Sequence, residues 1–140
     1  MDFELSEDQA MIREMVRDFA KEEIRPHAEE WDREETFPRE LYRKLGDLGI
    51  MGMTIPEAYG GAGLDYVSST LAVEEIARHD GSAALTVASH NSLGAGHIYL
   101  AGTDEQRERF LPDLASGEKL AAWALTEPGS GSDASGMRTT

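Results

Sequence analysis

A run of glycine and serine near the end of the 140-residue sequence has the form of a nucleotide-binding loop. Residues 129–134, Gly-Ser-Gly-Ser-Asp-Ala, match the pattern G-x-G-x-x-A, in which glycine backbones approach a pyrophosphate at the N-terminus of a following helix. Residues 135–140 are poor helix formers, and no βαβ unit precedes the loop. We therefore reject a Rossmann site. Two interpretations remain: a flexible linker, which the composition favours, or a loop whose N–H groups reach a phosphate without a helix.

The four histidines predict no metal site. His90 and His97 are seven residues apart and share one face of a helical segment, but no carboxylate lies within a turn of them. We interpret them as core or interface histidines with satisfied hydrogen bonds. Ser89 adjoins His90, but neighbouring residues of a helix point apart, so the pair predicts no catalytic triad. The absence of cysteine excludes thiolate zinc sites, iron–sulfur clusters, disulfides and a cysteine nucleophile.

Paired carboxylates occur at four places, as the dipeptides 22–23, 29–30, 34–35 and 74–75. Adjacent residues diverge around a helix, so most of these pairs belong to solvated faces. Glu74 and Glu75 are the strongest candidates for another role, because their helix adjoins a segment without charge.

The balance of charge restricts the partners of the chain. It contains 27 acidic and 13 basic residues, a formal net charge of −14, which opposes binding to nucleic acid or to an anionic membrane. Met1-Asp2-Phe3-Glu4 forms neither a basic n-region nor an apolar h-region, so we expect no secretory signal and a cytoplasmic location. The length suffices for one domain with a hydrophobic core.

Apolar residues recur every three to four positions up to about residue 116, which predicts helices throughout this part. Ser6 and Gln9 have the spacing of a capping box at the first helix. Pro26 lacks a backbone N–H and predicts a break, beyond which the apolar stripe resumes. Thr103 and Gln106 repeat the capping box before a helix that ends by residues 116–117.

Two more helices are separated by a glycine-rich loop. One begins at Pro38 and ends near Gly46 or Gly49, and the loop covers residues 50–64. The other runs over residues 66–79. Its predicted inward residues are Val67, Leu71, Ala72 and Ile76.

Residues 82–102 contain no Asp, Glu, Lys or Arg, although charged residues make up 29% of the chain. A helix without a charged face has no natural side toward water, so we expect this one to be buried nearly all round. Its His, Asn, Ser and Thr side chains make it too polar for a membrane span. It is predicted as the central helix of a multi-helix body.

The helical pattern of apolar residues ends at Glu118. Residues 120–125 form a continuous apolar run between Gly117 and Pro128, typical of a buried strand. One strand leaves both of its edges unpaired, so it requires partners from elsewhere. The predicted fold class is an all-α N-terminal domain of about five to six helices over residues 1–117. Residues 118–140 are then the start of a β-domain whose remainder is absent.

Five segments resemble those of one enzyme family, in the same order. Residues 123–134, Trp-Ala-Leu-Thr-Glu-Pro-Gly-Ser-Gly-Ser-Asp-Ala, closely resemble the first flavin-binding signature of the acyl-CoA dehydrogenases. Residues 5–9, 55–63, 90–94 and 111–117 are similar to the opening of the family, to its loop after the second helix and to two later segments. On these motifs the chain is identified as a member of the family.

The resemblance implies a larger protein and a reaction. Members have an N-terminal helical domain, a middle β-domain and a C-terminal four-helix bundle, through which they form homotetramers. They dehydrogenate acyl-CoA thioesters between the α and β carbons: a carboxylate removes the α proton, a hydride passes to N5 of FAD, and an electron-transferring flavoprotein reoxidises the flavin. The chain would be the first domain and the beginning of the second.

The family's cofactor contacts fall on five residues of this sequence. Trp123 and Leu125 correspond to positions beside the flavin ring, and Thr126 offers a hydroxyl and an N–H to its pyrimidine end. Gly131 allows close approach, and Ser132 corresponds to a residue near both the pyrophosphate and the substrate. The glycine-serine loop would therefore contact phosphate rather than serve as a linker.

The family also suggests a wall of the acyl pocket within residues 89–96. The candidate substrate contacts are Ser89, Asn91, Ser92, Leu93 and Ser132. No glutamate here matches the family's catalytic base, which is expected downstream of Thr140, as are a second flavin signature and cations for CoA. We therefore expect these residues alone to be inactive. Alternatives remain open: an acyl-CoA oxidase, a nitroalkane oxidase-like enzyme, or a non-catalytic helical interaction module.

Overall fold

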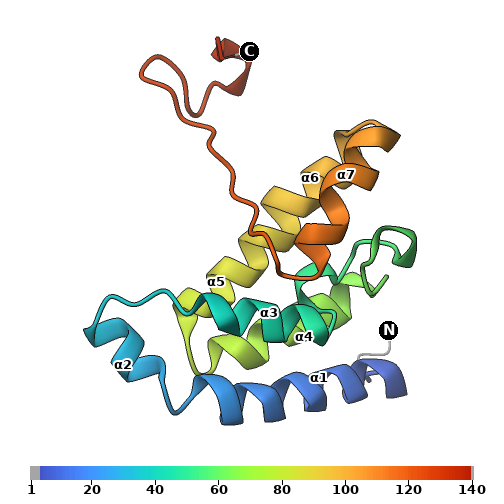
Figure 1. Ribbon diagram of the computed structural model, residues 1–140, viewed down its shortest axis with the longest axis vertical. Helices are drawn as coiled ribbons and strands as arrows, with labels where there is room; N and C mark the ends of the chain where they lie inside the picture. The colour runs from blue at the N-terminus through green and yellow to red at the C-terminus, as the bar shows by residue number, and fades with distance from the viewer. Residues whose placement is uncertain (1–3, 140) are drawn as a thin grey trace.

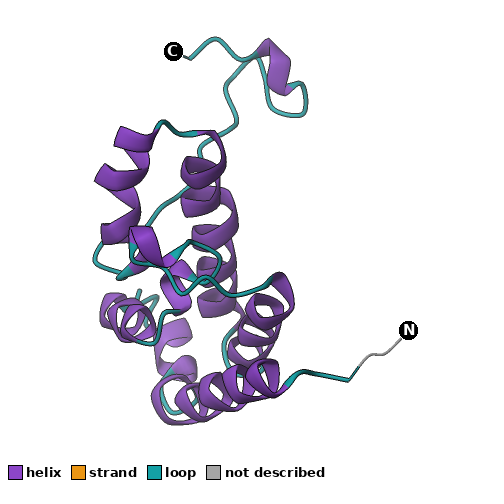
Figure 2. Cartoon of the chain, turned by 90° about the vertical axis from the view of Figure 1, so that its right-hand side faces the viewer, coloured by secondary structure: helices purple, strands orange, loops and turns teal. Residues whose placement is uncertain are grey.

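The computed structural model describes residues 4–139. Within this range the regular structure is helical, apart from one β-bridge between Glu127 and Ser130 (Figures 1 and 2). The α-helices are α1 (Glu7–Phe19), α2 (Ala28–Arg33), α3 (Arg39–Asp47), α4 (Tyr66–Ala77), α5 (Gly81–Ser89), α6 (Gly96–Ala101) and α7 (Asp104–Ala115). The π turn His90–Ala95 joins α5 and α6 into one continuous helix, so the described residues form six helical bodies. The predicted all-α class is confirmed.

Both predicted capping boxes are present. At α1 the Ser6 hydroxyl accepts from the N–H of Gln9 at 3.2 Å, and the Gln9 side chain accepts from the N–H of Ser6 at 3.1 Å. Thr103 and Gln106 make the same exchange at α7. Each box satisfies two N–H groups that would otherwise lack a helical partner. These local signals place the helix starts where the sequence predicts them.

The break at Pro26 is also confirmed. After α1 the chain forms a π turn over Ala20–Ile24 and a short turn before α2. α2 presents Trp31 to the core, so the apolar stripe resumes as predicted. Pro38 directly precedes α3, and α3 ends between the two predicted glycines.

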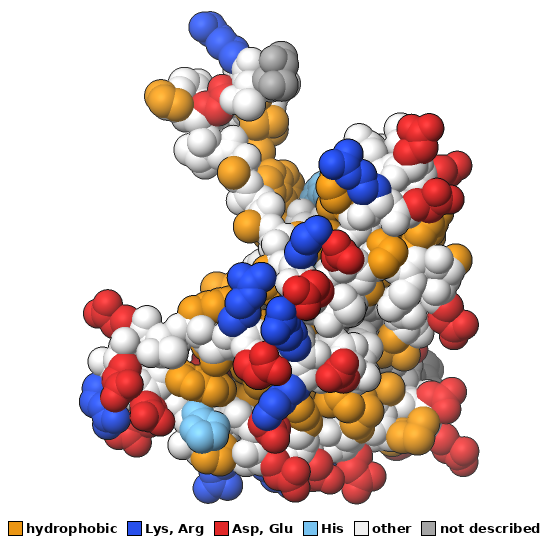
Figure 3. Space-filling model, viewed as in Figure 1, with side chains coloured by type: hydrophobic (Ala, Val, Ile, Leu, Met, Phe, Trp, Pro, Cys, Tyr) orange, Lys and Arg blue, Asp and Glu red, His pale blue; other side chains and the backbone are white. Residues whose placement is uncertain are grey.

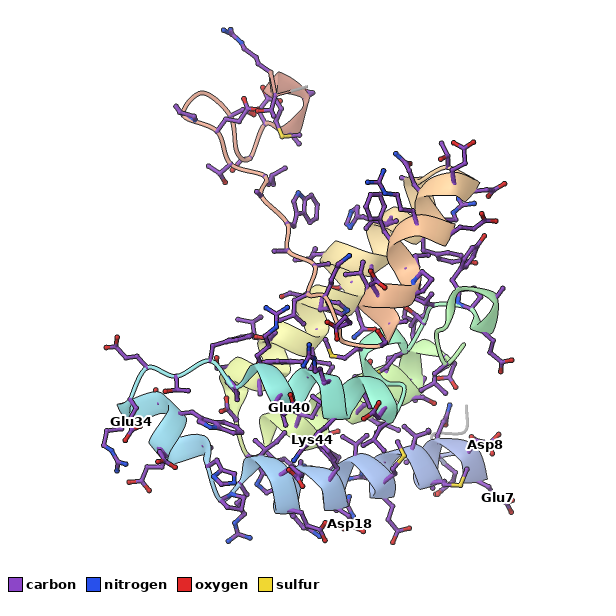
Figure 4. The ribbon with its side chains drawn as sticks, in the orientation of Figure 1. Glu7, Asp8, Asp18, Glu34, Glu40 and Lys44 are labelled. Atoms are coloured by element: carbon purple, nitrogen blue, oxygen red, sulfur yellow. The ribbon has the colours of Figure 1, made fainter. Side chains whose placement is uncertain are left out.

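The main core lies among α1, α3, α4 and α5. α1 and its π turn contribute Val16, Ala20 and Ile24, and α3 contributes the buried face Leu41, Tyr42 and Leu45. Figure 4 shows Lys44 of α3 lying between α3 and α1, where its ammonium pairs with Glu23. Glu7 and Asp8 lie in the first turn of α1 in the same view, at the helix end that favours negative charge.

One charged side chain is buried in this body. Glu75 on α4 is 1% exposed, and it pairs with Arg13 and Arg17 of α1, both at 2.9 Å. Arg78 on its own helix lies 3.5 Å from it. Of the paired glutamates in the sequence, this one therefore has a structural partner set rather than a solvated face.

Two predicted orientations are wrong. Of the residues predicted to face inward on α4, Ala72 and Ile76 are buried, but Val67 is 50% exposed, and the inward face includes Glu75, which was not predicted. The uncharged helix is not buried all round within residues 4–139, since Leu85 and Leu100 are 68% and 74% exposed. One side of it packs on α4 and α7 while the other has no covering element in the described part of the chain. The absence of charged side chains therefore did not mean that the helix is covered on all sides within residues 4–139.

The end of α7 packs tightly on α3. A Cβ on Gly46 would lie 2.0 Å from the carbonyl oxygen of Ser116, so only glycine permits this approach. Gly117 has φ +73° and would place a Cβ 2.2 Å from the carbonyl oxygen of Tyr42. The chain turns sharply here because glycine accepts the left-handed conformation.

Residues 118–139, which we call the arm, leave the helical body beyond this turn (Figures 1 and 3). The predicted buried strand at residues 120–125 is not formed: these residues have no regular structure, and most are exposed or partly exposed. The physical reason is that a lone strand has no partner for its N–H and C=O groups. Acidic side chains gather along α1 and at the α6–α7 end in Figure 3. No helix among residues 4–139 has the length and apolarity needed to cross a bilayer.

Candidate functional site

The arm and the helices beside it enclose a groove, which we call the Trp123 groove, of about 510 Å³. α6 and its preceding π turn form one wall, the end of α7 a second, and the arm a third. Its lining is mostly apolar and consists of Leu93, Gly94, His97, Ile98, Phe110, Asp113, Leu114 and residues 119–124. A groove of this size and character suits a flat, largely apolar ligand.

The continuous helix made of α5, the π turn and α6, residues 81–101, is called the long helix here. Two of its residues hold the beginning of the arm. The ring Nδ1 of His90 accepts a hydrogen bond from the N–H of Ala121 at 3.0 Å. One turn on, Gly94 faces the same residue, and a Cβ there would lie 2.2 Å from the Cβ of Ala121. The arm therefore rests on the helix backbone at this point, and glycine is required for the contact.

Trp123 lies two residues further along the arm. Its ring centre is 4.4 Å from that of His97, at an interplanar angle of 58°, and its side chain is 47% exposed. A large aromatic ring that is anchored on one side and open on the other is positioned to contact a ligand. Leu125 is half-buried further along the arm, and Thr126 is exposed.

The backbone of the arm has free donors. Within residues 4–139, the N–H groups from Ala122 to Thr126 donate no hydrogen bond, and neither do those of Gly131 and Ser132. Such groups are satisfied in a folded protein by a strand, a ligand or water. The run of donors next to Trp123 is therefore suited to the polar edge of a planar ring or to a neighbouring strand.

The glycine-serine loop is a tight turn rather than an extended linker. Glu127 and Ser130 exchange backbone hydrogen bonds at 2.7 and 3.2 Å, and the Ser130 hydroxyl donates to the carbonyl of Asp133. The carboxylate of Glu127 accepts from the N–H of Arg138 and of Thr139. The side chain of Thr139 contributes most to holding the pKa of Glu127 below its usual value, followed by these two backbone bonds.

Two of the predicted cofactor residues belong to this turn. A Cβ on Gly131 would lie 3.5 Å from the Thr126 side chain, and Ser132 is exposed. Only a 3₁₀ turn, Ala134–Gly136, follows, so no α-helix begins at the loop. Within residues 4–139 the loop therefore lacks the helix that a Rossmann site requires.

The predicted substrate residues do not gather at one place. Leu93 lines the Trp123 groove, whereas Asn91 and Ser92 line a second groove of about 460 Å³ between α4 and the long helix. Ser89 lines neither groove, and Ser132 lies on the arm. In the described part of the chain, three of the five residues are therefore divided between two grooves, and Ser89 and Ser132 line neither of them.

The side chain of Asn91 is fully occupied. Its oxygen accepts from the N–H of Met53 at 3.0 Å, and its nitrogen donates to the carbonyls of Ile50 and Val87 at 2.9 and 3.0 Å. All three contacts are buried, and those with Ile50 and Met53 join the long helix to the 3₁₀ turn Ile50–Gly52 and the residue after it, at the start of the glycine-rich loop. In this arrangement both amide N–H groups of Asn91 are used and its oxygen already accepts one bond, so no donor is left for a ligand.

The carboxylate in the Trp123 groove is paired. Asp113 accepts from the ammonium of Lys119 at 2.7 Å, so it does not present a free base to the groove. Nowhere in residues 4–139 do three or more His, Cys, Asp or Glu approach closely enough to hold a metal ion.

Sequence reasoning interpreted His90 and His97 as core or interface histidines, which the buried and fully hydrogen-bonded ring of His90 confirms, but it did not predict that they and Gly94 contact the arm. These residues are spaced by four and three positions, so they share the face of the long helix that holds the arm. The spacing was visible in the sequence. What they contact was not, because Ala121 and Trp123 lie more than 25 residues further along the chain.

Comparison with known proteins identifies the family to which the chain belongs. Residues 6–118 match the model of the acyl-CoA dehydrogenase N-terminal domain. The chain belongs to the acyl-CoA dehydrogenase family. A similar protein is the probable acyl-CoA dehydrogenase YngJ of Bacillus subtilis, 51% identical over 139 residues, which cover 99% of this chain and 37% of the relative.

Two solved structures share the fold. A chain in a structure of the electron transferring flavoprotein of Acidaminococcus fermentans superposes with a TM-score of 0.93 at 44% identity, over 100% of this chain and 37% of that one. The acyl-CoA dehydrogenase of Bacillus anthracis complexed with FAD has a TM-score of 0.83 at 45% identity, over 96% of this chain and 23% of that one. The chain thus spans 37% of the length of the first two of these relatives and 23% of the third.

Proposed function

We propose that these 140 residues are the N-terminal part of an FAD-dependent acyl-CoA dehydrogenase, which removes hydrogen from the α and β carbons of acyl-CoA thioesters. The helical domain covers residues 1–117 in this proposal, and residues 118–140 begin the middle β-domain. Family membership and the Bacillus anthracis relative complexed with FAD support it. Bound FAD would supply the acceptor for the hydride.

The observation that carries the proposal is the run of free N–H groups beside Trp123. The N–H groups from Ala122 to Thr126 have no partner within residues 4–139, and those of residues 122–124 belong to the wall of an apolar groove that includes an exposed indole ring. An isoalloxazine ring presents a flat apolar face and a polar edge of oxygen and nitrogen acceptors, so both features fit it. Donors directed at that edge favour hydride acceptance, because negative charge develops there on reduction.

Each cofactor residue has a role in this proposal. Trp123 and Leu125 contact the ring, and Thr126 donates from its hydroxyl and N–H to the pyrimidine end. The N–H groups of Gly131 and Ser132 are free and exposed enough to reach the pyrophosphate.

The acyl chain would lie against the long helix. Leu93 in the Trp123 groove and Ser132 on the arm are the contacts best supported by position. Ser89 and Ser92 lie further away, and Asn91 would shape the wall through its backbone contacts rather than bind the thioester.

Other properties of the whole protein follow from family membership as proposals. The catalytic carboxylate lies outside these residues, so they do not turn over alone. Electrons pass to an electron-transferring flavoprotein, in line with the Acidaminococcus fermentans match. The whole protein is a cytoplasmic homotetramer.

The test is the visible spectrum of the whole protein, recorded under argon during titration with acyl-CoAs of increasing length. A yellow protein that bleaches supports the proposal, and the most effective thioester defines the substrate class. Bleaching followed by rapid reoxidation in air identifies an oxidase, and a yellow protein that never bleaches indicates chemistry such as nitroalkane oxidation. A colourless protein that FAD cannot reconstitute overturns the enzyme and favours an interaction module.

A matched pair of variants tests the role of Thr126. Thr126→Val removes the hydroxyl with little change of shape, whereas Thr126→Ser retains it. We expect FAD affinity to fall about threefold to tenfold in the first and to stay near wild type in the second, the range of one hydrogen bond. Equal affinities in all three proteins would contradict the assignment.

A further inference from the structure

His90 is a buried residue whose ring joins three parts of the chain. It stands at the first position of the π turn between α5 and α6 and is 1% exposed. Its Nε2 lies 3.0 Å from the carbonyl oxygen of Met51 and 3.1 Å from that of Leu114, and its Nδ1 lies 3.0 Å from the N–H of Ala121. The three partners belong to the 3₁₀ turn Ile50–Gly52 at the start of the glycine-rich loop, to α7 and to the arm.

These partners determine the state of the ring. Two carbonyl oxygens face Nε2, so this nitrogen carries the proton and shares it between them. The N–H of Ala121 faces Nδ1, so this nitrogen is unprotonated and accepts. Only the neutral tautomer with hydrogen on Nε2 satisfies all three contacts. The two nitrogens thus have separate tasks: Nε2 ties the helical body together, and Nδ1 holds the arm.

The arm has few other attachments at this point. Lys119 N donates to the carbonyl of Asp113, but beyond Ala121 the next five N–H groups have no partner within residues 4–139. Gly94 limits Ala121 from the same side, because a Cβ there would lie 2.2 Å from that of Ala121. The contact with His90 is therefore the last hydrogen bond of the body before Trp123.

We propose that His90 is a positioning residue for the flavin-binding segment: its Nδ1, with Gly94 beside it, sets where residues 121–126 enter the cofactor site. The proposal rests on the proposed function, since it assigns flavin contacts to these residues. His90 touches neither flavin nor substrate in this scheme. It acts through the backbone of Ala121, and so it sets the position of Trp123 and of the free N–H groups that follow.

Two substitutions separate the tasks of the nitrogens. In His90→Gln the side-chain amide can place its nitrogen near the position of Nε2, which retains the donor to the carbonyls and loses the acceptor for Ala121. In His90→Asn the amide oxygen can lie near the position of Nδ1, which retains the acceptor and loses the distant donor. A purely structural role would make the asparagine variant the more damaging one.

The experiment measures two quantities in the whole protein. Hydrogen–deuterium exchange of a peptide covering residues 119–123 is recorded with and without FAD, and the rate of FAD dissociation is followed by recovery of flavin fluorescence. In His90→Gln we expect both the exchange of this peptide and the dissociation of FAD to be about threefold to tenfold faster, the range expected for one hydrogen bond. His90→Asn is expected to match wild type in both.

A second pair keeps the test independent of the folding of the histidine variants. Gly94→Ala would displace Ala121 from Nδ1 and leave the two Nε2 contacts of His90 in place, so it should also speed up both rates. Gly81→Ala adds a methyl group on the same helix where nothing lies within 4 Å, and it should change neither.

The outcomes distinguish this inference from the proposed function. Equal rates in His90→Gln and wild type, or faster rates in His90→Asn than in His90→Gln, would overturn the positioning role even if FAD binds normally. If wild-type protein binds no FAD, the proposed function fails, and the positioning role for the cofactor fails with it. Peptide exchange in the absence of FAD then decides only whether His90 holds Ala121.

Discussion

Arg17 and Glu75 form a two-pronged ion pair between α1 and α4. The Nε of Arg17 donates to Oε2 of Glu75 at 3.1 Å, and its Nη2 donates to Oε1 at 2.9 Å. Arg13, one helical turn earlier, donates to Oε1 at 2.9 Å. These partners, with Arg17 contributing most, lower the pKa of Glu75 from 4.5 to about 2 despite its burial. One buried carboxylate thus joins α4 to two arginines of α1, in addition to the apolar packing between the two helices.

Replacing this carboxylate should destabilise the helical body. Glu75→Gln leaves Arg13 and Arg17 without their counter-charge, and loss of one partner of a buried ion pair costs about 3 kcal/mol. The local free energy of opening can be measured from hydrogen exchange of α1 and α4 amides in the whole protein. Glu74→Gln is the control: this carboxylate is half exposed and pairs only with Arg78, so its loss should cost about 0.5 kcal/mol or less. Similar costs at both positions would contradict this account.

The same carboxylate gives the stability a dependence on acid. Because the pKa of Glu75 is lower in the folded state, about 2 against an ordinary 4.5, the unfolded state binds its proton first as the pH falls. The contribution is therefore complete above pH 4.5 and is lost between pH 4.5 and about 2. Subtracting the pH–stability curve of Glu75→Gln from that of wild type should leave a difference that shrinks across this window. A constant difference would refute the pKa assignment.

His90 should make the folding stability depend on pH in a second range, above that of Glu75. Burial lowers its pKa below the ordinary 6.5, against the opposing effect of its bonds to the carbonyls of Leu114 and Met51. The charged groups nearest in the chain to its contacts, Asp113 and Lys119, pair with each other, and residues 82–102 contain no Asp, Glu, Lys or Arg. A His with a lowered pKa is protonated more easily when unfolded, so stability is full above pH 6.5 and falls as the pH drops from there toward the folded pKa. In His90→Gln this loss of stability below pH 6.5 should be absent. If it persists in that variant, another group is responsible for it.

Asn91 should affect stability more than substrate binding. Asn91→Ala leaves the buried N–H of Met53 and the carbonyl of Ile50 without their partner, at a cost of about 2 kcal/mol. Ser92→Ala, by contrast, removes an exposed hydroxyl bonded to its own helix and should change stability by about 0.5 kcal/mol or less. Chemical denaturation of the two variants measures the difference. A raised KM for acyl-CoA with unchanged stability in Asn91→Ala would instead restore Asn91 as a substrate contact.

Gly117 should tolerate no side chain. Its φ of +73° disfavours other residues, and a Cβ would lie 2.2 Å from the carbonyl of Tyr42, so Gly117→Ala should cost about 2 kcal/mol or more. Gly81, at the first position of α5, has open space around it. Gly81→Ala should therefore be neutral or stabilise by up to about 1 kcal/mol, because alanine favours the helix. The melting temperature should fall in Gly117→Ala and should stay the same or rise in Gly81→Ala.

The sequence by itself determined the local elements. The capping boxes at Ser6 and Thr103 and the break at Pro26 depend on groups within a few residues of one another, so the type and spacing of those residues were sufficient. The helical class and the rejection of a Rossmann site follow from the same short-range patterns. The flavin signature, too, was visible as a continuous segment.

Tertiary structure decided everything that depends on distant partners. The long helix was predicted to be buried all round, yet burial depends on which elements lie beside it, and one side has none within residues 4–139. The strand at residues 120–125 needs partner strands, so its apolar run alone does not form one. Glu75 meets Arg17 across 58 residues, and His90 meets Ala121 across 31. Such contacts arise only when packing brings separate helices together, because a side chain's partners are set by the fold rather than by its neighbours in the chain.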